Sequence, residues 1–220
     1  MRILGVDEAG RGCVLGPLVV GAFLLVDGDQ ATLRAAGADD SKRLSAKRRA
    51  AARAALAPLG TPDVRLIDAR AIDAGNLNVL EEAAIVSLVL AHRPDHVVMD
   101  ALGHPRTLPA LEARLAAAIA PHGLAPTWHI APKADRDHPV CGAASVFAKT
   151  TRDARLAELT APHGDLGSGY PSDPKTRRWL AAHAATGAPW PAFVRTRWDT
   201  VAQLSQLSLE PGSSAPPSAR

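Results

Sequence analysis

The sequence predicts an α/β protein, with a mixed sheet of five strands flanked by helices and a small helical lobe at the C-terminal end. The chain opens with two consecutive apolar, strand-like runs, and helical patterns then alternate with short apolar runs. After about residue 160 only helix signals remain. We therefore expect a main domain over residues 1–160, a helical lobe over 161–209 and a disordered tail over 210–220, which is rich in Pro, Ser and Gly.

Five short runs rich in Val, Leu and Ile have the length and composition of strands. They cover residues 2–7, 18–26, 63–67, 96–99 and 127–131. The first two follow each other with no helical pattern between them, whereas helical patterns separate the later ones. This order favours a mixed sheet over a fully parallel one.

Helices are expected where a capping residue precedes an apolar pattern of helical period. The expected helices begin at Ser45, Asn76, Thr107, Val140, Asp173 and Thr196. The fourth of them runs to about Leu159 and opens with small residues, which allow a helix to pack closely on a sheet. The segment between the second strand and Ser45 is expected to be a loop.

Composition excludes several classes of protein. With 220 residues, 47% of them hydrophobic, the chain can form one substantial core. Two cysteines, Cys13 and Cys141, make neither a disulfide framework nor a zinc site. The longest apolar run, residues 13–26, is too short to span a membrane and contains Pro17. We expect a soluble, cytoplasmic protein that has no membrane segment.

Four acidic residues are placed where strands end. Asp7 and Glu8 come at the end of the first apolar strand, and Asp100 and Asp135 follow the fourth and fifth. Carboxylates on a buried strand are costly unless a positive charge neutralises them, and functional groups gather where strand ends converge. The set predicts a site for two hard cations about 4 Å apart, able to activate water for phosphoryl displacement. The alternative for a lone aspartate is a helix cap or a surface charge.

A Gly10-Arg11-Gly12 segment directly follows the first two acids. Its glycines let backbone amides approach a ligand, and its arginine can bind phosphate. Lys42 lies near the start of the helix at Ser45, where the helix dipole also favours phosphate. Carboxylates beside phosphate-binding groups indicate phosphodiester chemistry. The basic run behind Lys42 could equally be a solvated helix face, and the net charge of +3 permits nucleic-acid binding without demonstrating it.

Two further groups are candidate nucleic-acid contacts. Tyr170, the only tyrosine, lies on a glycine-rich loop and could stack on a sugar or base; its alternative role is a packed loop anchor. Lys149 and Arg152 lie one helical turn apart and share a face able to meet phosphates. Plain solvent exposure of that face is the alternative.

Six motifs together resemble the ribonuclease HII family, most closely its archaeal and eukaryotic branch. They are Gly5–Gly12, Asp40–Ser45, Met99–Ala101, Lys133–Asp135, Ala143–Lys149 and Gly167–Thr176. The resemblance covers roughly residues 1–205 in order. It implies an RNase H-like fold with a helical C-terminal lobe, and metal-dependent hydrolysis of the RNA strand of RNA/DNA hybrids. Cleavage 5′ of single ribonucleotides in duplex DNA is implied too, leaving 3′-hydroxyl and 5′-phosphate ends, as in ribonucleotide excision repair and primer removal.

The resemblance also implies roles for individual residues. Asp7, Glu8, Asp100 and Asp135 would hold two Mg²⁺ or Mn²⁺ ions. Residues 10–12 would contact the ribose 2′-hydroxyl and its phosphate, which is reasonable because only that hydroxyl distinguishes RNA from DNA. Tyr170 would stack beside the junction sugar, and Lys42 would hold a phosphate. Lys149 and Arg152 complete the expected substrate contacts, and the enzyme would act as a monomer.

The chain departs from the family pattern in two places. Cys13 stands where proline is common, and Cys141 stands where valine is typical. Both are interpreted as small buried apolar residues, with a redox-sensitive pair as the alternative. The segment from Gln206 to Pro211 lacks the paired aromatics of clamp-binding tails, so clamp binding through the tail is not predicted.

Two other functions remain open from the sequence. One is a metal nuclease or resolvase of the same superfamily that acts on another substrate, which cleavage of an all-DNA duplex would reveal. The other is a catalytically silent nucleic-acid-binding subunit, which the complete set of four carboxylates disfavours. A divalent-metal titration of cleavage separates the second from an enzyme.

Overall fold

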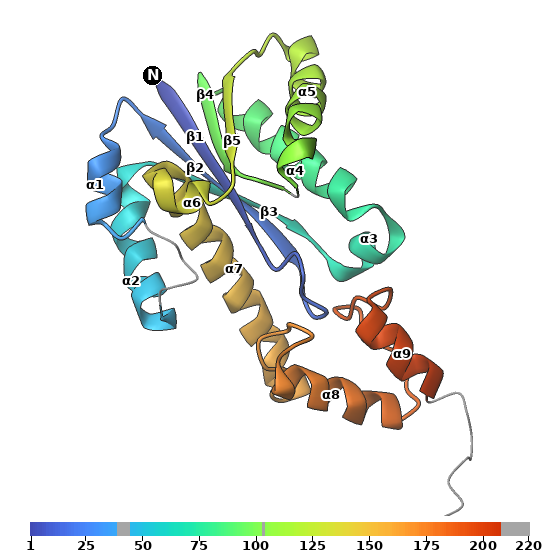
Figure 1. Ribbon diagram of the computed structural model, residues 1–220. Helices are drawn as coiled ribbons and strands as arrows, with labels where there is room; N and C mark the ends of the chain where they lie inside the picture. Colours follow the sequence, from blue (N-terminus) through green and yellow to red (C-terminus); the bar gives the residue numbers. More distant parts are fainter. Residues whose placement is uncertain (39–44, 103, 208–220) are drawn as a thin grey trace, which may run out of the picture.

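The structure is a computed structural model that describes residues 1–38, 45–102 and 104–207 (Figure 1). Its centre is a five-stranded sheet in the order β3-β2-β1-β4-β5. The strands are β1 Arg2–Ala9, β2 Leu18–Val26, β3 Thr61–Ile67, β4 His96–Asp100 and β5 Thr127–Ala131. β1, β2 and β3 pair antiparallel, whereas β4 pairs parallel with both β1 and β5. The predicted mixed five-stranded sheet is confirmed.

Helices lie on both faces of this sheet (Figure 1). They are α1 Gln30–Ala35, α2 Ala46–Leu56, α3 Ala69–Ala74, α4 Leu77–His92, α5 Leu108–Ile119, α6 Ala134–Asp137, α7 Pro139–His163, α8 Pro174–Ala185 and α9 Asp199–Leu207. Three predicted starts carry the expected caps, because the side chains of Ser45, Asn76 and Asp173 accept hydrogen bonds from backbone N–H groups of the first turn.

Other helix boundaries differ from the expectation. α1 occupies part of the predicted loop, where Asp29 caps it. α9 begins at Asp199 rather than at Thr196, because the Thr196 amide and hydroxyl both donate to the Asp73 carboxylate at 2.7 Å. α7 continues to His163, four residues beyond its predicted end. Since α7 crosses residue 160 without a break, the division into residues 1–160 and 161–209 stays a prediction.

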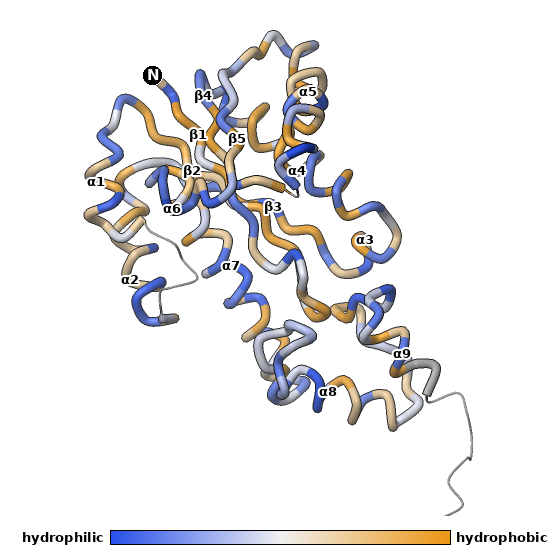
Figure 2. The backbone as a smooth tube through the Cα atoms, viewed as in Figure 1, coloured by the Kyte–Doolittle hydropathy of each residue, from blue (hydrophilic) through white to orange (hydrophobic). Residues whose placement is uncertain are grey.

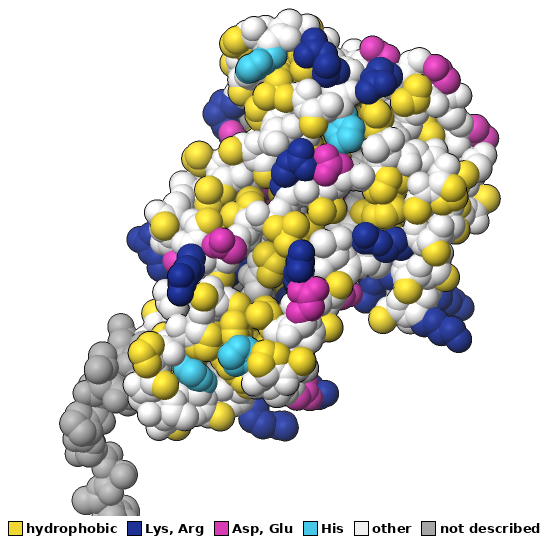
Figure 3. All heavy atoms as spheres, turned by 180° about the vertical axis from the view of Figure 1, so that it is seen from behind, with side chains coloured by type: hydrophobic (Ala, Val, Ile, Leu, Met, Phe, Trp, Pro, Cys, Tyr) yellow, Lys and Arg dark blue, Asp and Glu magenta, His cyan; other side chains and the backbone are white. Residues whose placement is uncertain are grey.

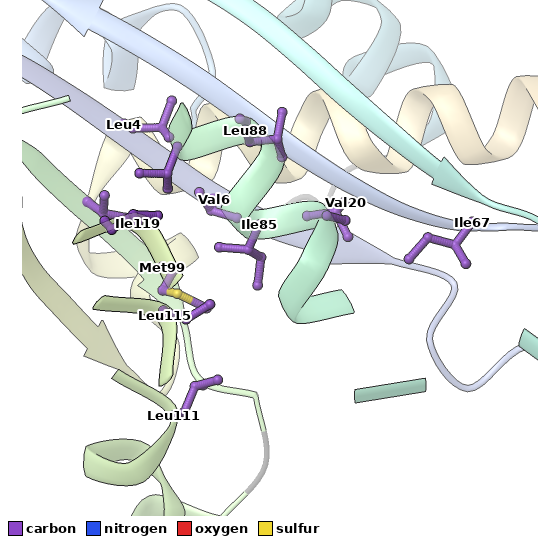
Figure 4. Packing of buried hydrophobic residues seen from close by; sticks show 14 of the residues in the cluster. Leu4, Val6, Val20, Ile67, Ile85, Leu88, Met99, Leu111, Leu115 and Ile119 are labelled. Carbon is purple, nitrogen blue, oxygen red and sulfur yellow. The ribbon is translucent and has the colours of Figure 1, made fainter. Parts of the chain in front are cut away.

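Alternate residues of the central strands enter two different cores. Leu4 and Val6 of β1 face α4 and α5, where they pack with Ile85, Leu88 and Met99 (Figure 4). Ile3 and Phe23 face the opposite side and pack against α1, α2 and α7. Figure 2 shows hydrophobic residues concentrated along the central strands. This alternation is the one expected of a sheet covered by helices on both faces.

α7 lies unusually close to β1. A Cβ atom added at Gly5 would be 2.1 Å from the Val140 carbonyl oxygen, so only glycine fits there. The first turns of α7 carry Cys141, Ala143 and Ala144, all fully buried. The small residues at the start of this helix therefore bring it directly onto the strand that carries Asp7 and Glu8.

The C-terminal lobe has an apolar core of its own. Val14 and Leu15, which follow the Gly-Arg-Gly turn (residues 10–12), pack there with Leu156 of α7 and with Leu180 and Val201 of the lobe. The lobe is thus built onto the segment that follows β1, as well as onto the end of α7. In the part of the chain that is described, no helix combines the length and the apolar character needed to cross a membrane.

Candidate active site

Asp7 and Glu8 lie inside β1, where they pair with Gly21 and Val20 of β2. This corrects the expectation that the first strand ends at Asp7, because β1 continues to Ala9. Consecutive residues of a strand point to opposite faces. Asp7 points toward α7, is almost fully buried and accepts a hydrogen bond from Ser145, whereas Glu8 is partly exposed.

Asp100 is the last residue of β4, as predicted. Its Oδ1 accepts hydrogen bonds from the amides of Ala101 at 3.1 Å and Ala134 at 3.2 Å. Ala134 is the first residue of α6, and the next residue is the buried Asp135. Asp100 therefore fixes the start of the short helix that carries the fourth predicted carboxylate.

The four carboxylates share one electrostatic environment. Burial raises the pKa of Asp7 well above its ordinary value, and the charges of Glu8 and Asp135 raise it further. The pKa of the Cys141 thiol is likewise raised, first by burial and then by Asp7, Asp100 and Asp135. The charges of these aspartates therefore act on the same buried region beside β1, and their role as one site stays a prediction.

The four acids have the ligand chemistry of a divalent-cation site, although their side chains are not arranged as one here. Asp7 Oδ2 is buried and makes no hydrogen bond with any described residue. In the described ranges, no three His, Cys, Asp or Glu side chains are arranged so that they could hold a metal ion. The unsatisfied Asp7 oxygen and the all-carboxylate donor set nevertheless match the oxygen ligands that Mg²⁺ and Mn²⁺ take.

A side chain of the C-terminal lobe holds the Gly-Arg-Gly turn (residues 10–12) in place. Gly10 has φ +88°, a conformation that favours glycine. Arg195 is fully buried and donates to the carbonyls of Gly10 at 2.7 Å, Arg11 at 2.9 Å and Gly16 at 3.1 Å. Burial lowers the pKa of Arg195 to about 10, so its guanidinium stays charged at neutral pH. One side chain of the lobe thus fixes three carbonyls in and beside the turn.

Tyr170 lies against this turn. The amides of Val14 and Leu15 donate to the Gly169 carbonyl at 2.8 and 3.3 Å. The Tyr170 ring comes within 4.0 Å of the position that a Gly12 Cβ would occupy, and the side chain is partly exposed. The structure therefore brings the predicted Gly-Arg-Gly turn and the predicted aromatic residue side by side, although they are far apart in the sequence.

The loop before Tyr170 is fixed by the start of α8. The Asp173 carboxylate accepts from the amides of Ser168 at 2.6 Å and Lys175 at 2.8 Å. A hydrogen bond with the Ser168 side chain, followed by those from the Ser168 and Lys175 amides, lowers the pKa of Asp173 to about 2. Thr176, fully buried, accepts from the Gly169 amide at 2.9 Å. The loop is therefore ordered by α8 and is not a free surface loop.

The expectation that Lys149 and Arg152 present one phosphate-facing surface is wrong for Arg152. Its side chain is only 1% exposed, and its Nη2 donates to the Ser168 carbonyl at 2.5 Å and contacts Cys13 Sγ at 3.0 Å. The guanidinium also lies 5.5 Å from the centre of the Tyr170 ring. Arg152 therefore supports Tyr170 from within the protein. Lys149 pairs with Asp153 at 2.6 Å and keeps some exposure.

Three residues at this site were not found from the sequence. Ser145 hydrogen-bonds Asp7, Arg195 holds the turn, and Glu81 forms an ion pair with Arg11. A signal existed for Glu81, because it is a charged residue at helical spacing within the apolar face formed by Ala84, Ile85 and Leu88 of α4. Nothing in the local sequence marks Arg195. Lys42 lies outside the described residues.

Both cysteines are free and buried, and they have different neighbours. Cys141 Sγ donates to the Val6 carbonyl at 3.1 Å, whereas Cys13 contacts Arg152. This agrees with their interpretation as small buried residues.

Comparison with known proteins identifies the family. The family model described as Ribonuclease HII matches residues 4–201. Ribonuclease HII of Aeropyrum pernix is 38% identical over 208 residues, which cover 92% of this chain and 89% of that protein. The crystal structure of ribonuclease H2 from Pyrococcus horikoshii superposes with a TM-score of 0.83 at 33% identity, covering 94% of this chain and 99% of the other.

Another similar structure is that of a complex between PCNA and the ribonuclease HII of Archaeoglobus fulgidus. It is 33% identical, has a TM-score of 0.78, and covers 90% of this chain and 96% of that chain. These matches extend over both the sheet and the lobe. The chain therefore belongs to the ribonuclease HII family, whose members are hydrolytic endonucleases.

Proposed function

We propose that this endonuclease of RNA/DNA hybrids also cuts 5′ of single ribonucleotides embedded in duplex DNA, leaving 3′-hydroxyl and 5′-phosphate ends. The observation that carries the proposal is the contact between the Tyr170 loop and the Gly-Arg-Gly turn, close to the four carboxylates. A single 2′-hydroxyl is the only chemical mark of an embedded ribonucleotide. A narrow turn of backbone beside an aromatic ring can contact that hydroxyl and stack on the adjoining sugar.

In this proposal Asp7, Glu8, Asp100 and Asp135 hold Mg²⁺ or Mn²⁺. When bound, such ions supply an activated water and neutralise charge on the leaving oxygen. Burial and the hydrogen bond from Ser145 hold the Asp7 side chain in place. Its Oδ2 atom makes no hydrogen bond with any described residue and is therefore available as a ligand. Asp100 holds α6 and therefore the carboxylate of Asp135 beside it.

In this proposal the Gly-Arg-Gly turn (residues 10–12) and the residues that hold it recognise the ribose. The glycines at positions 10 and 12 carry no side chain, so the backbone can approach the sugar closely. Arg11 would bind the adjoining phosphate, and Tyr170 would stack on the next sugar. Lys42 remains a proposed phosphate contact, as does Lys149.

Cleavage of three end-labelled duplexes tests the proposal. One carries a single ribonucleotide, one is a uniform RNA/DNA hybrid and one is all DNA; each is incubated with Mg²⁺, Mn²⁺ or EDTA. We expect metal-dependent cleavage of the first two, with a cut 5′ of the single ribonucleotide, and an intact all-DNA duplex. Cleavage of the all-DNA duplex would instead support a nuclease or resolvase of other specificity. Binding without cleavage under every condition would indicate a silent subunit.

Replacing Tyr170 with alanine is expected to affect the two cleaved substrates unequally. Loss of the ring removes one sugar–aromatic contact, worth about 1–3 kcal/mol for comparable stacking. We expect kcat/KM for the single-ribonucleotide duplex to fall about 10- to 100-fold, and that for the uniform hybrid to fall less. Tyr170→Phe keeps the ring and serves as the matched control. Equal losses on both substrates would contradict a role for Tyr170 at the junction.

The biological setting is proposed on the same basis. Cleavage at embedded ribonucleotides suits ribonucleotide excision repair and primer removal by a cytoplasmic monomer. The Archaeoglobus protein is known in a complex with PCNA, but the tail segment from Gln206 to Pro211 lacks paired aromatics. We therefore expect deletion of residues 208–220 to leave any affinity for a sliding clamp unchanged in a binding titration.

A further inference from the structure

Glu81 is a fully buried carboxylate that the proposed chemistry does not use. It lies on the face of α4 that packs into the sheet, one turn before Ala84 and Ile85. Burying a carboxylate among apolar side chains is costly unless a positive charge compensates it. A residue of this kind on an otherwise apolar helix face needs an explanation.

The compensating charge is the arginine of the Gly-Arg-Gly turn. Arg11 Nη1 forms an ion pair with the Glu81 carboxylate, and Arg11 Nη2 donates to Asn78 Oδ1. Asn78 and Glu81 are three residues apart on α4, so they lie on the same side of the helix. Two side chains of α4 therefore hold the guanidinium in one orientation.

This contact lies beside the carboxylates on one side and a pocket on the other. Glu81 borders the same closely packed spot as Asp7, Glu8 and Asp100, which leaves no room for a water molecule. Glu81 and Arg11 also line a pocket of about 420 Å³ between α4 and α5, which Arg106 and Arg114 border as well. The guanidinium is thus placed next to the carboxylate site, and its side chain remains 33% exposed.

On the face seen in Figure 3, basic and acidic side chains are interspersed. Arg114 has its own partner in the pocket, because it donates twice to the Glu82 carboxylate at 2.7 and 2.9 Å. Arg11 differs from it in having a partner that is completely buried.

We propose that Glu81 is a positioning residue, which orders Arg11 before substrate arrives so that its guanidinium meets the phosphate beside the ribonucleotide. The inference rests on the proposed function. A free arginine side chain loses rotamer entropy when it is fixed on a phosphate, and prior ordering by Glu81 lowers that cost of binding. Glu81 pairs with Arg11 Nη1 and Asn78 accepts from Nη2, and the exposed part of the guanidinium faces outward, where it can donate to phosphate oxygens.

The test compares Glu81→Gln with Glu82→Gln, which makes the same chemical change one residue along the same helix. Affinity for the single-ribonucleotide duplex is measured by fluorescence anisotropy in EDTA, so no cleavage occurs. We expect Glu81→Gln to raise Kd about tenfold, equivalent to about 1.4 kcal/mol, and Glu82→Gln to change it less than twofold. In Mg²⁺, Glu81→Gln should raise KM by a similar factor and leave kcat within twofold.

A double-mutant cycle with Arg11→Met shows whether Glu81 acts through Arg11. With Arg11 absent, adding Glu81→Gln should weaken binding no further, because the residue it positions is gone. The same addition should raise the melting temperature, since it removes a buried carboxylate that has lost its partner. Asn78→Ala, at an exposed position, tests the other contact without disturbing the core and should raise Kd about two- to threefold, in the range of one hydrogen bond.

Several results would overturn the positioning role. One is an unchanged Kd in Glu81→Gln, and another is a lower kcat with an unchanged KM in that variant. Equal effects of Glu81→Gln and Glu82→Gln on Kd would also contradict it. So would additive effects of Glu81→Gln and Arg11→Met on Kd. A lower kcat alone would place Glu81 with the four carboxylates. Failure of the proposed function is seen separately, as absence of cleavage of the single-ribonucleotide duplex by the unaltered protein.

Discussion

Replacing Asp7 with asparagine is expected to reduce cleavage of both cleaved substrates on the order of a thousandfold, equivalent to about 4 kcal/mol of transition-state stabilisation. Asp7 is the most deeply buried of Asp7, Glu8 and Asp100, and its Oδ2 has no partner among the described side chains and backbone. Asparagine keeps the shape and removes the charge that a divalent ion requires. Affinity for the uncleaved duplex, measured by anisotropy in EDTA, should stay within about threefold.

Thermal unfolding gives a second measurement that does not depend on activity. Ions that bind only the folded state stabilise it, so Mg²⁺ or Mn²⁺ should raise the melting temperature of the unaltered protein. Asp7→Asn should abolish that rise. Asp137→Asn, an exposed aspartate two residues after Asp135, is the matched control and should keep it. A normal metal-dependent rise together with normal cleavage in Asp7→Asn would refute the metal assignment.

Replacing Arg195 with methionine is expected to have the largest effect on stability. Methionine fills a similar volume but removes the hydrogen bonds that Arg195 donates to the carbonyls of Gly10, Arg11 and Gly16, of which the Gly10 carbonyl keeps only the Cys13 amide. Hydrogen bonds from charged donors contribute about 1.5–3 kcal/mol each, and relaxation of the turn recovers part of that. We expect a loss of about 3–6 kcal/mol in the free energy of unfolding, or about 6–20 °C in melting temperature.

The control is Arg197→Met, two residues along the same segment. Arg197 is exposed and donates to the Asp73 carbonyl at 2.8 Å, so its replacement should cost less than about 1 kcal/mol. Arg195→Met should also reduce the preference for the ribonucleotide-containing duplex over all-DNA duplex when binding is measured below the melting temperature. Similar melting temperatures for the two variants would show that Arg195 does not hold the turn.

Two buried arginines connect the lobe to the catalytic sheet. Arg195 holds the turn, and Arg152 contacts Cys13 of the adjoining segment and the Ser168 carbonyl below Tyr170. These contacts therefore determine the shape of the Gly-Arg-Gly turn and the position of the Tyr170 ring beside it. This explains why a helical lobe distant from the carboxylates in sequence belongs to the same site.

Much of the fold could be predicted from local sequence patterns. The strand-forming runs and the capping residues depend on neighbours within a few positions, and the observed sheet and three helix caps agree with them. The grouping of the four acids into one site stays a prediction. The end of β1 was placed at Asp7 because Asp7 and Glu8 are polar, yet pairing with β2 continues through Glu8 to Ala9. In that case backbone hydrogen bonds to a neighbouring strand outweigh the local preference of the residues.

The tertiary structure alone decided which charged side chains face inward and what they contact. Arg152 shares a helix with exposed residues, but the Tyr170 loop covers it. Arg11 meets Glu81, and Arg195 meets the turn 184 residues earlier in the chain. Burial of a charge is possible only where a distant segment supplies its partner. The sequence by itself determined the strands and predicted the acids of the proposed site, whereas the packing of distant segments determined which arginines hold the Gly-Arg-Gly turn and the Tyr170 loop.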